Sequence, residues 1–251
     1  MAMRKTFPSC RHARLGAFLF LLTTLLLLTG SDRTSEIKVI ELKGPPAVII
    51  MADGSTPPVR VGELLPLGAT VKTPPDSTMK LLFANGAVVI LQPRSQLRLA
   101  LFASKDSVEA HKNINARTPE WSKSDTNLDL ESGTVLIDVP KLKKESKFEV
   151  TTPLGIAGVR GTRFYVSAKK DRTSVGVAEG LVITTSLLGE STRVAVNQAI
   201  GLTPKGSAPA TANEIQYIQT LDAAFGGMPH RPVNPSQKPT PKSSAGYRVS
   251  E

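Results

Sequence analysis

Short apolar runs that alternate with turn residues constrain this 251-residue chain to a mainly β fold. β-type runs span residues 37–42, 47–51, 70–73, 79–83, 87–91, 97–101, 128–130, 134–139, 147–152, 163–168, 174–178, 181–186, 193–196 and 199–202. The strongest hairpin signal is Asn85-Gly86, which stands between two aliphatic runs. Many of the turn signals recur every 8 to 12 residues or so, as in a sandwich, barrel or stacked β-coil.

A helical pattern occurs near the C-terminus. Asn213 could cap this helix, and the pattern ends at Gly226-Gly227. Its apolar residues recur at spacings of three and four: Ile215, Ile218, Leu221, Ala224 and Phe225. We therefore predict a mainly β fold of stacked or rolled short antiparallel strands, β-solenoid-like or a sandwich, with one short C-terminal helix.

The N-terminus has the layout of a secretory signal peptide. Residues 1–31 contain four basic residues and no acidic one, and the uncharged, leucine-rich run 15–31 follows the basic head. Cleavage near Asp32 and retention as an inner-membrane anchor both remain open, and the run is short for a membrane span. Either outcome places the rest of the chain outside the cytoplasm, in the periplasm or the extracellular space.

Charge and cysteine content limit the partners and the chemistry. Beyond residue 31 the chain has 27 basic and 21 acidic residues, a net charge of +6. This moderate excess favours contact with anionic partners, but it does not specify one. The only cysteine, Cys10, lies in the basic head, so the exported part can form no disulfide and no thiolate site.

Two polar segments interrupt or follow the β pattern. Residues 103–127 predict a long surface excursion in which Trp121 is the largest apolar residue. It is either a tolerated insertion with Trp121 packed on the core or a binding loop. Residues 228–251 contain five prolines among small and polar residues, which predicts a disordered tail.

Two motifs resemble the FecR family, and they follow each other along the chain in the order of that family. The more distinctive one, which we call the first motif, is the downstream one. The first is Thr152-Pro153-Leu154-Gly155-Ile156-Ala157-Gly158-Val159-Arg160-Gly161-Thr162-Arg163-Phe164-Tyr165-Val166, followed by Val177-Ala178-Glu179-Gly180-Leu181-Val182. The second is Val61-Gly62-Glu63-Leu64 through Thr70-Val71-Lys72-Thr73, then Ser77, Leu81, Asn85-Gly86, Ser95 and Leu97-Arg98-Leu99.

The resemblance implies an extracytoplasmic β domain that, in well-known members, passes a signal from an outer-membrane transporter to a sigma factor. Only about 14 residues precede the apolar run, too few for a helical anti-sigma segment, so we expect a stand-alone FecR domain. The predicted organisation is residues 1–31 as signal peptide or anchor, 32–54 as leading strands, 55–203 as FecR-like domain, 204–227 as linker and helix, and 228–251 as tail.

The glycines of the first motif suggest a compact turn before a strand at Phe164, because Gly155, Gly158 and Gly161 can each supply a positive φ or a close approach. We expect Arg160 to be buried and to donate to carbonyl groups at a tight crossing, with partner contact as the alternative. The candidate structural or partner-contact residues are Gly155, Gly158, Arg160, Gly161, Thr162, Phe164, Glu179 and Gly180.

Catalysis and nucleic-acid binding are both disfavoured. The three histidines, His12, His111 and His230, lie outside the predicted core elements, and no cofactor or metal motif is present. The short lysine runs lack interleaved aromatic residues. We therefore expect a non-enzymatic signalling or adaptor module that binds an envelope protein. The alternative is a structural module that binds an anionic wall polymer, glycan or membrane surface. An exposed β edge or apolar patch would favour the first.

Overall fold

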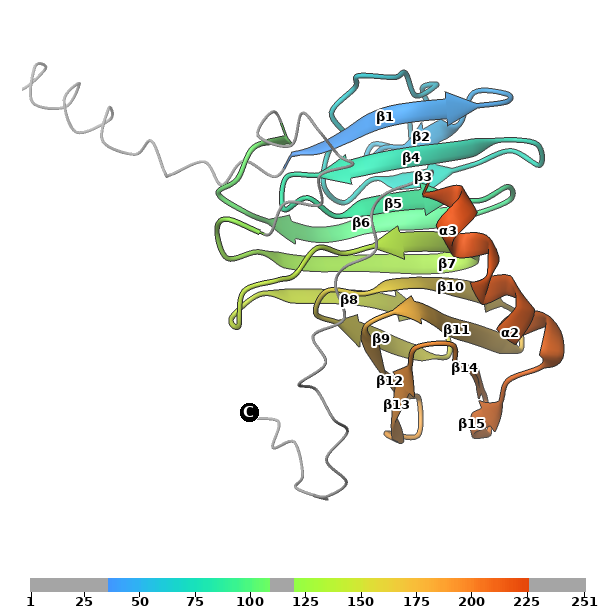
Figure 1. Cartoon of the computed structure of the whole chain (residues 1–251). Coiled ribbons are helices and arrows are strands. Elements are labelled where there is room, and N and C mark those ends of the chain that lie inside the picture. Colours follow the sequence, from blue (N-terminus) through green and yellow to red (C-terminus); the bar gives the residue numbers. More distant parts are fainter. Residues whose placement is uncertain (1–35, 109–119, 226–251) are drawn as a thin grey trace, which may run out of the picture. The chain divides into compact units, whose positions relative to one another are not determined.

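A computed structural model describes residues 36–108 and 120–225, and Figure 1 shows the arrangement of their strands and helices. The predicted signal peptide or anchor, the middle of the polar excursion and the predicted tail lie outside these residues. None of the helices that are described is long and apolar enough to cross a membrane.

The strands form two facing layers. Layer A consists of β1 (Ile37–Lys43), β4 (Thr78–Phe83), β5 (Val88–Leu91), the second half of β7 (Asp125–Asp138), β10 (Arg163–Lys169), β11 (Arg172–Glu179), β14 (Ala199–Thr203) and β15 (Gly206–Pro209). Layer B consists of β2 (Val48–Ile50), β3 (Thr70–Lys72), β6 (Gln96–Ala103), the first half of β7, β8 (Lys147–Thr152), β9 (Gly155–Val159), β12 (Leu181–Ser186) and β13 (Ser191–Ala195).

The core lies between the two layers. The ring of Phe83 in layer A meets those of Phe102 and Phe148 in layer B edge-on, at centroid distances of 5.2 and 6.5 Å. All three side chains are buried, as expected for aromatic rings that face each other across a sandwich. The predicted mainly β fold of stacked short strands is confirmed, and its layers are those of a sandwich.

Strand β7 joins the layers. The sequence predicts two strands, 128–130 and 134–139, separated by a turn at Ser132-Gly133. The structure shows one strand that bends there instead, because Gly133 has φ +92° and Ser95 lies against it. The Ser95 hydroxyl accepts from Thr134 N at 2.9 Å, which holds the bend. The β7–β8 pair is parallel, whereas the sequence predicts antiparallel strands.

Two short helices, α2 (Ala212–Ile218) and α3 (Thr220–Ala224), replace the single predicted helix and lie across layer A (Figure 1). The N-cap is Thr211 and not Asn213, because Thr211 and Glu214 form a reciprocal capping box. Strand β15 lies inside the predicted linker, where no aliphatic run marked it.

Polar contacts fasten α2 to β10 and β11. Arg172 Nε donates to Glu214 Oε1 at 2.6 Å, and the Tyr165 hydroxyl donates to the Glu214 carbonyl at 2.8 Å. The ring of Tyr165 lies over Gly176, where a Cβ would come within 2.3 Å of it. Burial raises the pKa of the Glu214 carboxyl, but hydrogen bonds from Arg172, Ser174 and Thr211 outweigh burial and lower this pKa to about 2.

We expect Glu214→Gln to lower the free energy of unfolding by about 1–2 kcal/mol at pH 7, a value that allows for the partial exposure of Arg172. Because the pKa of Glu214 is depressed from 4.5 on folding, its contribution is complete above that value and is lost as the pH falls towards 2. Urea unfolding of both proteins between pH 7 and pH 3 measures this difference.

The control for this prediction is Glu145→Gln, which changes an exposed loop carboxylate. An equal acid dependence of Glu214→Gln and the wild type would contradict the prediction.

Candidate functional site

The first motif crosses from layer B to layer A between β9 and β10, and the chain crosses back between β11 and β12. Thr162 connects these crossings to the end of β7. Its backbone N donates to Val139 O at 3.1 Å, its backbone O accepts from Val139 N at 3.0 Å, and its hydroxyl donates to Leu181 O at 3.0 Å. Thr162 is 1% exposed, so the motif forms part of the core framework.

Two of the predicted glycines are required by this crossing. Gly161 has φ +94° and Gly180 has φ +89°, a region that other residues adopt with strain. A Cβ on Gly180 would lie 2.6 Å from Gly161 O and 2.8 Å from the Thr162 hydroxyl. The two crossings can therefore touch only if position 180 has no side chain.

We expect Gly180→Ala to lower the free energy of unfolding by about 3 kcal/mol, from a strained φ plus the steric clash. Gly189→Ala is the matched control, since Gly189 has φ +80° but open space around it, and should cost about 1 kcal/mol. Denaturant unfolding of both variants measures the difference. Equal costs would show that the contact between the crossings is unimportant.

The segment that the sequence predicts as a compact turn is the strand β9, and this prediction is wrong in that part. Only its first residue needs glycine: Gly155 has φ +150°, and a Cβ there would lie 2.3 Å from Thr185 O. Gly158 lies in the strand without positive φ, and a Cβ at this position would have its nearest neighbour 3.9 Å away. The fold therefore has room for a side chain at Gly158.

The buried arginine of the motif is Arg163 and not Arg160, which corrects the sequence-based expectation. Arg160 is exposed, and its guanidinium donates to the Lys144 carbonyl. Arg163 is 1% exposed; it forms ion pairs with Asp138 at 3.2 Å and Asp222 at 2.7 Å. Burial opposes its charge, but the two carboxylates outweigh burial and raise the pKa of Arg163.

The remaining motif residues support this buried ion pair. Phe164 is fully buried in the core. Glu179 is 8% exposed and lies opposite Arg163 in the β10–β11 register. The Arg163 guanidinium also lies 5.3 Å from the ring centre of Phe225, just after α3, a cation–π distance. Asp138 and Asp222, which no sequence motif marked as site residues, are thus part of the same cluster.

We expect Arg163→Met to lower the free energy of unfolding by about 3 kcal/mol or more, because it leaves the buried Asp138 without this cation. The control is Arg160→Met, which makes the same change at the exposed arginine of the motif and should alter the free energy by about 0.5 kcal/mol or less. Thermal unfolding followed by circular dichroism compares the two. A larger loss in the Arg160 variant would reverse this assignment.

The outer face of layer B carries exposed aliphatic side chains that no described element covers. We call Ile156, Gly158, Leu181, Ile183 and Arg193 the β9–β12 face. Ile183 lies opposite both Gly158 and Arg193, and Leu181 lies opposite Ala195. Ile156, Leu181 and Ile183 are 41%, 43% and 47% exposed. The adjacent β13 is the last strand of its layer, so an apolar patch lies beside a sheet edge.

The sequence contained a signal for this face. A strand with one solvated side alternates apolar and polar residues, but Leu181-Val182-Ile183 is continuously apolar. Val182 points into the core, and its two neighbours therefore point outward. The sequence alone could not distinguish this arrangement from a strand that is covered on both sides.

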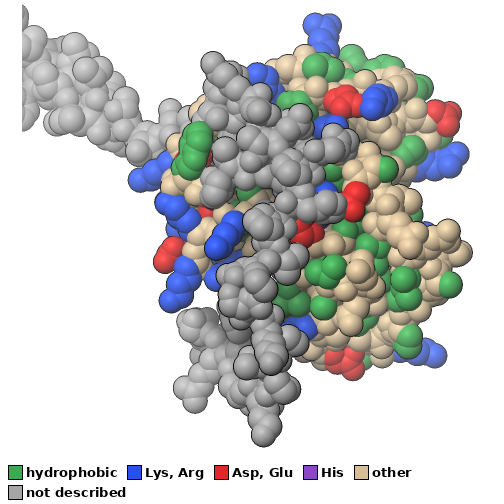
Figure 2. All heavy atoms as spheres, viewed as in Figure 1, with side chains coloured by type: hydrophobic (Ala, Val, Ile, Leu, Met, Phe, Trp, Pro, Cys, Tyr) green, Lys and Arg blue, Asp and Glu red, His purple; other side chains and the backbone are tan. Residues whose placement is uncertain are grey.

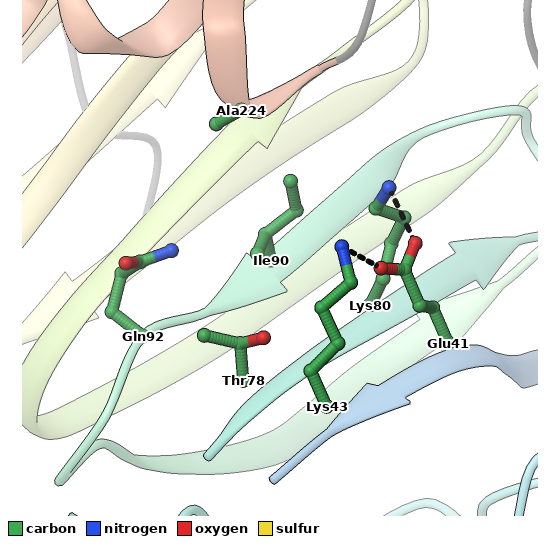
Figure 3. A pocket seen from close by; sticks show the side chains of 7 residues that line it. All are labelled: Glu41, Lys43, Thr78, Lys80, Ile90, Gln92 and Ala224. Atoms are coloured by element: carbon green, nitrogen blue, oxygen red, sulfur yellow. Dashed lines mark ion pairs between the residues drawn. The ribbon is translucent and has the colours of Figure 1, made fainter. Parts of the chain in front are cut away.

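A shallow hollow of about 260 Å³ lies on the outer face of layer A beside α3, and Figure 3 shows its side chains. Glu41 pairs there with Lys43 at 2.5 Å and with Lys80 at 2.9 Å, and these contacts lower the pKa of Glu41. The charged groups thus satisfy one another, which does not suit a substrate site. Within residues 36–108 and 120–225, no group of His, Cys, Asp and Glu could hold a metal ion.

The central part of the chain is similar to one known family. Residues 69–183 match the family described as FecR protein. Two crystal structures of a protein from Parabacteroides distasonis, provisionally described as an anti-sigma factor, resemble the chain with a TM-score of 0.43 and 16% sequence identity. The likeness covers 59% of this chain and 62% of that one. No curated protein matches the sequence.

Proposed function

We propose that this chain is a non-enzymatic, exported envelope protein whose FecR-like domain binds another envelope protein as a signalling or adaptor module, because residues 69–183 match the FecR protein family. Members of this family have regulatory roles. The N-terminal layout of a basic head and an apolar run supports export.

The observation that carries the proposal is the β9–β12 face. Its three large aliphatic side chains are exposed on the same face of the neighbouring strands β9 and β12, where each costs hydration free energy unless a partner covers it. Arg160 and Arg193 are exposed beside them and supply a polar rim. An apolar centre with a charged rim is the usual composition of a protein-binding surface.

Gly158 makes this surface flat. It lies between Glu149 and Ile183 on neighbouring strands, and the fold leaves room for a Cβ there. The absence of a side chain is therefore not explained by the packing of the domain itself. A partner chain that approaches the backbone at this point explains it, because only glycine permits such a close approach.

We expect Gly158→Tyr to keep the free energy of unfolding within about 0.5 kcal/mol of the wild type, because the site is on a surface strand that suits tyrosine. The same substitution should block the partner. A photoreactive amino acid at position 183 of the full chain, expressed in its own cells, should form an adduct with one envelope protein. Gly158→Tyr should reduce this adduct at least about tenfold, equivalent to about 1.4 kcal/mol.

The matched control is Leu101→Tyr, which places the same side chain at an exposed position of β6 in the same layer. It should leave the adduct unchanged. An unchanged adduct in Gly158→Tyr, or adducts spread over many proteins, would contradict a specific partner on the β9–β12 face.

A further inference from the structure

Several loops gather at one end of the sandwich, which we call the basic end. Ala103 of β6 lies opposite Asp125 of β7, and Asp125 lies beside Lys147 of β8. Phe148 lies opposite Val159, so β9 also ends here. The described parts of the β6–β7 excursion, the β7–β8 loop and the β9–β10 crossing are therefore neighbours.

Buried carboxylates fix the base of the polar excursion at this end. Glu120 is 4% exposed and accepts from Lys143 N at 2.7 Å and from the Ser146 hydroxyl at 2.6 Å. Asp106 accepts from Ser122 N at 3.0 Å. Because Trp121 lies between Glu120 and Ser122, its backbone position is held by the β7–β8 loop on one side and by Asp106 on the other.

Trp121 is 50% exposed and does not pack into the core, which corrects the core-packed alternative of the sequence analysis. Lys143 Nζ donates to its carbonyl oxygen, so a lysine of the β7–β8 loop lies beside this residue. An amphipathic ring held at the surface is a group that prefers the boundary between water and lipid headgroups.

Exposed cations lie in the loops next to this tryptophan. Figure 2 shows Lys and Arg side chains gathered along the edge of the molecule where the β7–β8 loop lies in Figure 1. Asp125 pairs with Lys123 at 3.5 Å, and Glu145 is exposed in the β7–β8 loop. The exposed cations of this end therefore outnumber its exposed carboxylates. The exposed cations of this end are Lys105, Lys123, Lys141, Lys143, Lys144, Lys147 and Arg160.

The start of the described chain lies at the same end. Glu36 accepts from the Ser107 hydroxyl at 2.7 Å and from Val108 N at 2.8 Å, beside the excursion. Residues 32–35 alone separate Glu36 from the apolar run 15–31. The chain therefore reaches its described part at the end that carries Trp121 and the lysines.

From these observations we infer that the basic end rests on an anionic phospholipid surface, with Trp121 at the headgroup level and the lysines above the phosphates. Clustered lysine and arginine residues attract anionic headgroups at short range, and salt weakens this attraction. A membrane is favoured over a soluble anionic glycan because only residues 32–35 separate Glu36, at this end, from the apolar run 15–31 that the sequence predicts as a signal peptide or anchor.

Trp121 is the only tryptophan of the chain, so its fluorescence reports on the basic end alone. The full chain is added to vesicles of phosphatidylglycerol and phosphatidylcholine that contain a brominated lipid, and to neutral phosphatidylcholine vesicles with the same quencher. We expect Trp121 emission to shift to shorter wavelength and to be quenched on the anionic vesicles, with both effects weakened by added salt. Contact through residues 15–31 alone would leave Trp121 unquenched.

The test variant is K141Q/K143Q/K144Q, and the matched control is K169Q/K170Q/K205Q, whose exposed lysines lie at the opposite end of the sandwich. We expect the first to need at least about tenfold more anionic lipid for half-maximal quenching, since each cation contributes about fivefold. The control should behave as the wild type.

Equal effects of the two triple variants would overturn the assignment to the basic end, as would equal quenching on neutral vesicles. A Trp121 shift with soluble polygalacturonate but without quenching by brominated lipid would replace the membrane by an anionic glycan. Because the β9–β12 face is unchanged in both triple variants, failure here is distinguishable from failure of the protein-binding proposal.

Discussion

The two crossings between the layers can touch only because Gly161 and Gly180 adopt positive φ angles and position 180 has no side chain. Thr162 then bonds to both Val139 and Leu181, which ties the end of β7 to the start of β12. The positions of β9 and β10, and of β11 and β12, in their two layers depend on this contact. The surfaces that these four strands present depend on it as well.

The β10–β11 pair in layer A and the β9–β12 pair in layer B present different outer faces. In layer A, β10 and β11 are covered by α2 and α3, which Arg163 and Arg172 fasten through carboxylates of the helices. In layer B, β9 and β12 have no described cover, and Leu181 and Ile183 are exposed. The protein buries the Arg163–Asp138 pair and leaves Leu181 and Ile183 in water, the reverse of what burial free energy alone would favour for these side chains.

The β9–β12 face and the basic end meet at Arg160. In the β-sheet register, its neighbour Val159 lies opposite Val182, beside Leu181, while the Arg160 guanidinium contacts the Lys144 carbonyl in the β7–β8 loop. A protein bound on the aliphatic face would therefore stand next to any surface that the lysines contact. For an adaptor in the envelope, this arrangement would present a partner close to the membrane.

The sequence determined most of the strands, many of the turns and the need for glycine at Gly161, because these features follow from local patterns and backbone sterics. Local pattern could not decide which strands continue. The Ser132-Gly133 signal marks a bend within β7, since Ser95, 37 residues earlier, holds the chain there. Burial of Arg163 instead of Arg160 likewise needs Asp138 and Asp222, which meet it only in space. Tertiary structure alone decided that Trp121, Leu181 and Ile183 remain exposed, because exposure depends on which elements pack on each face.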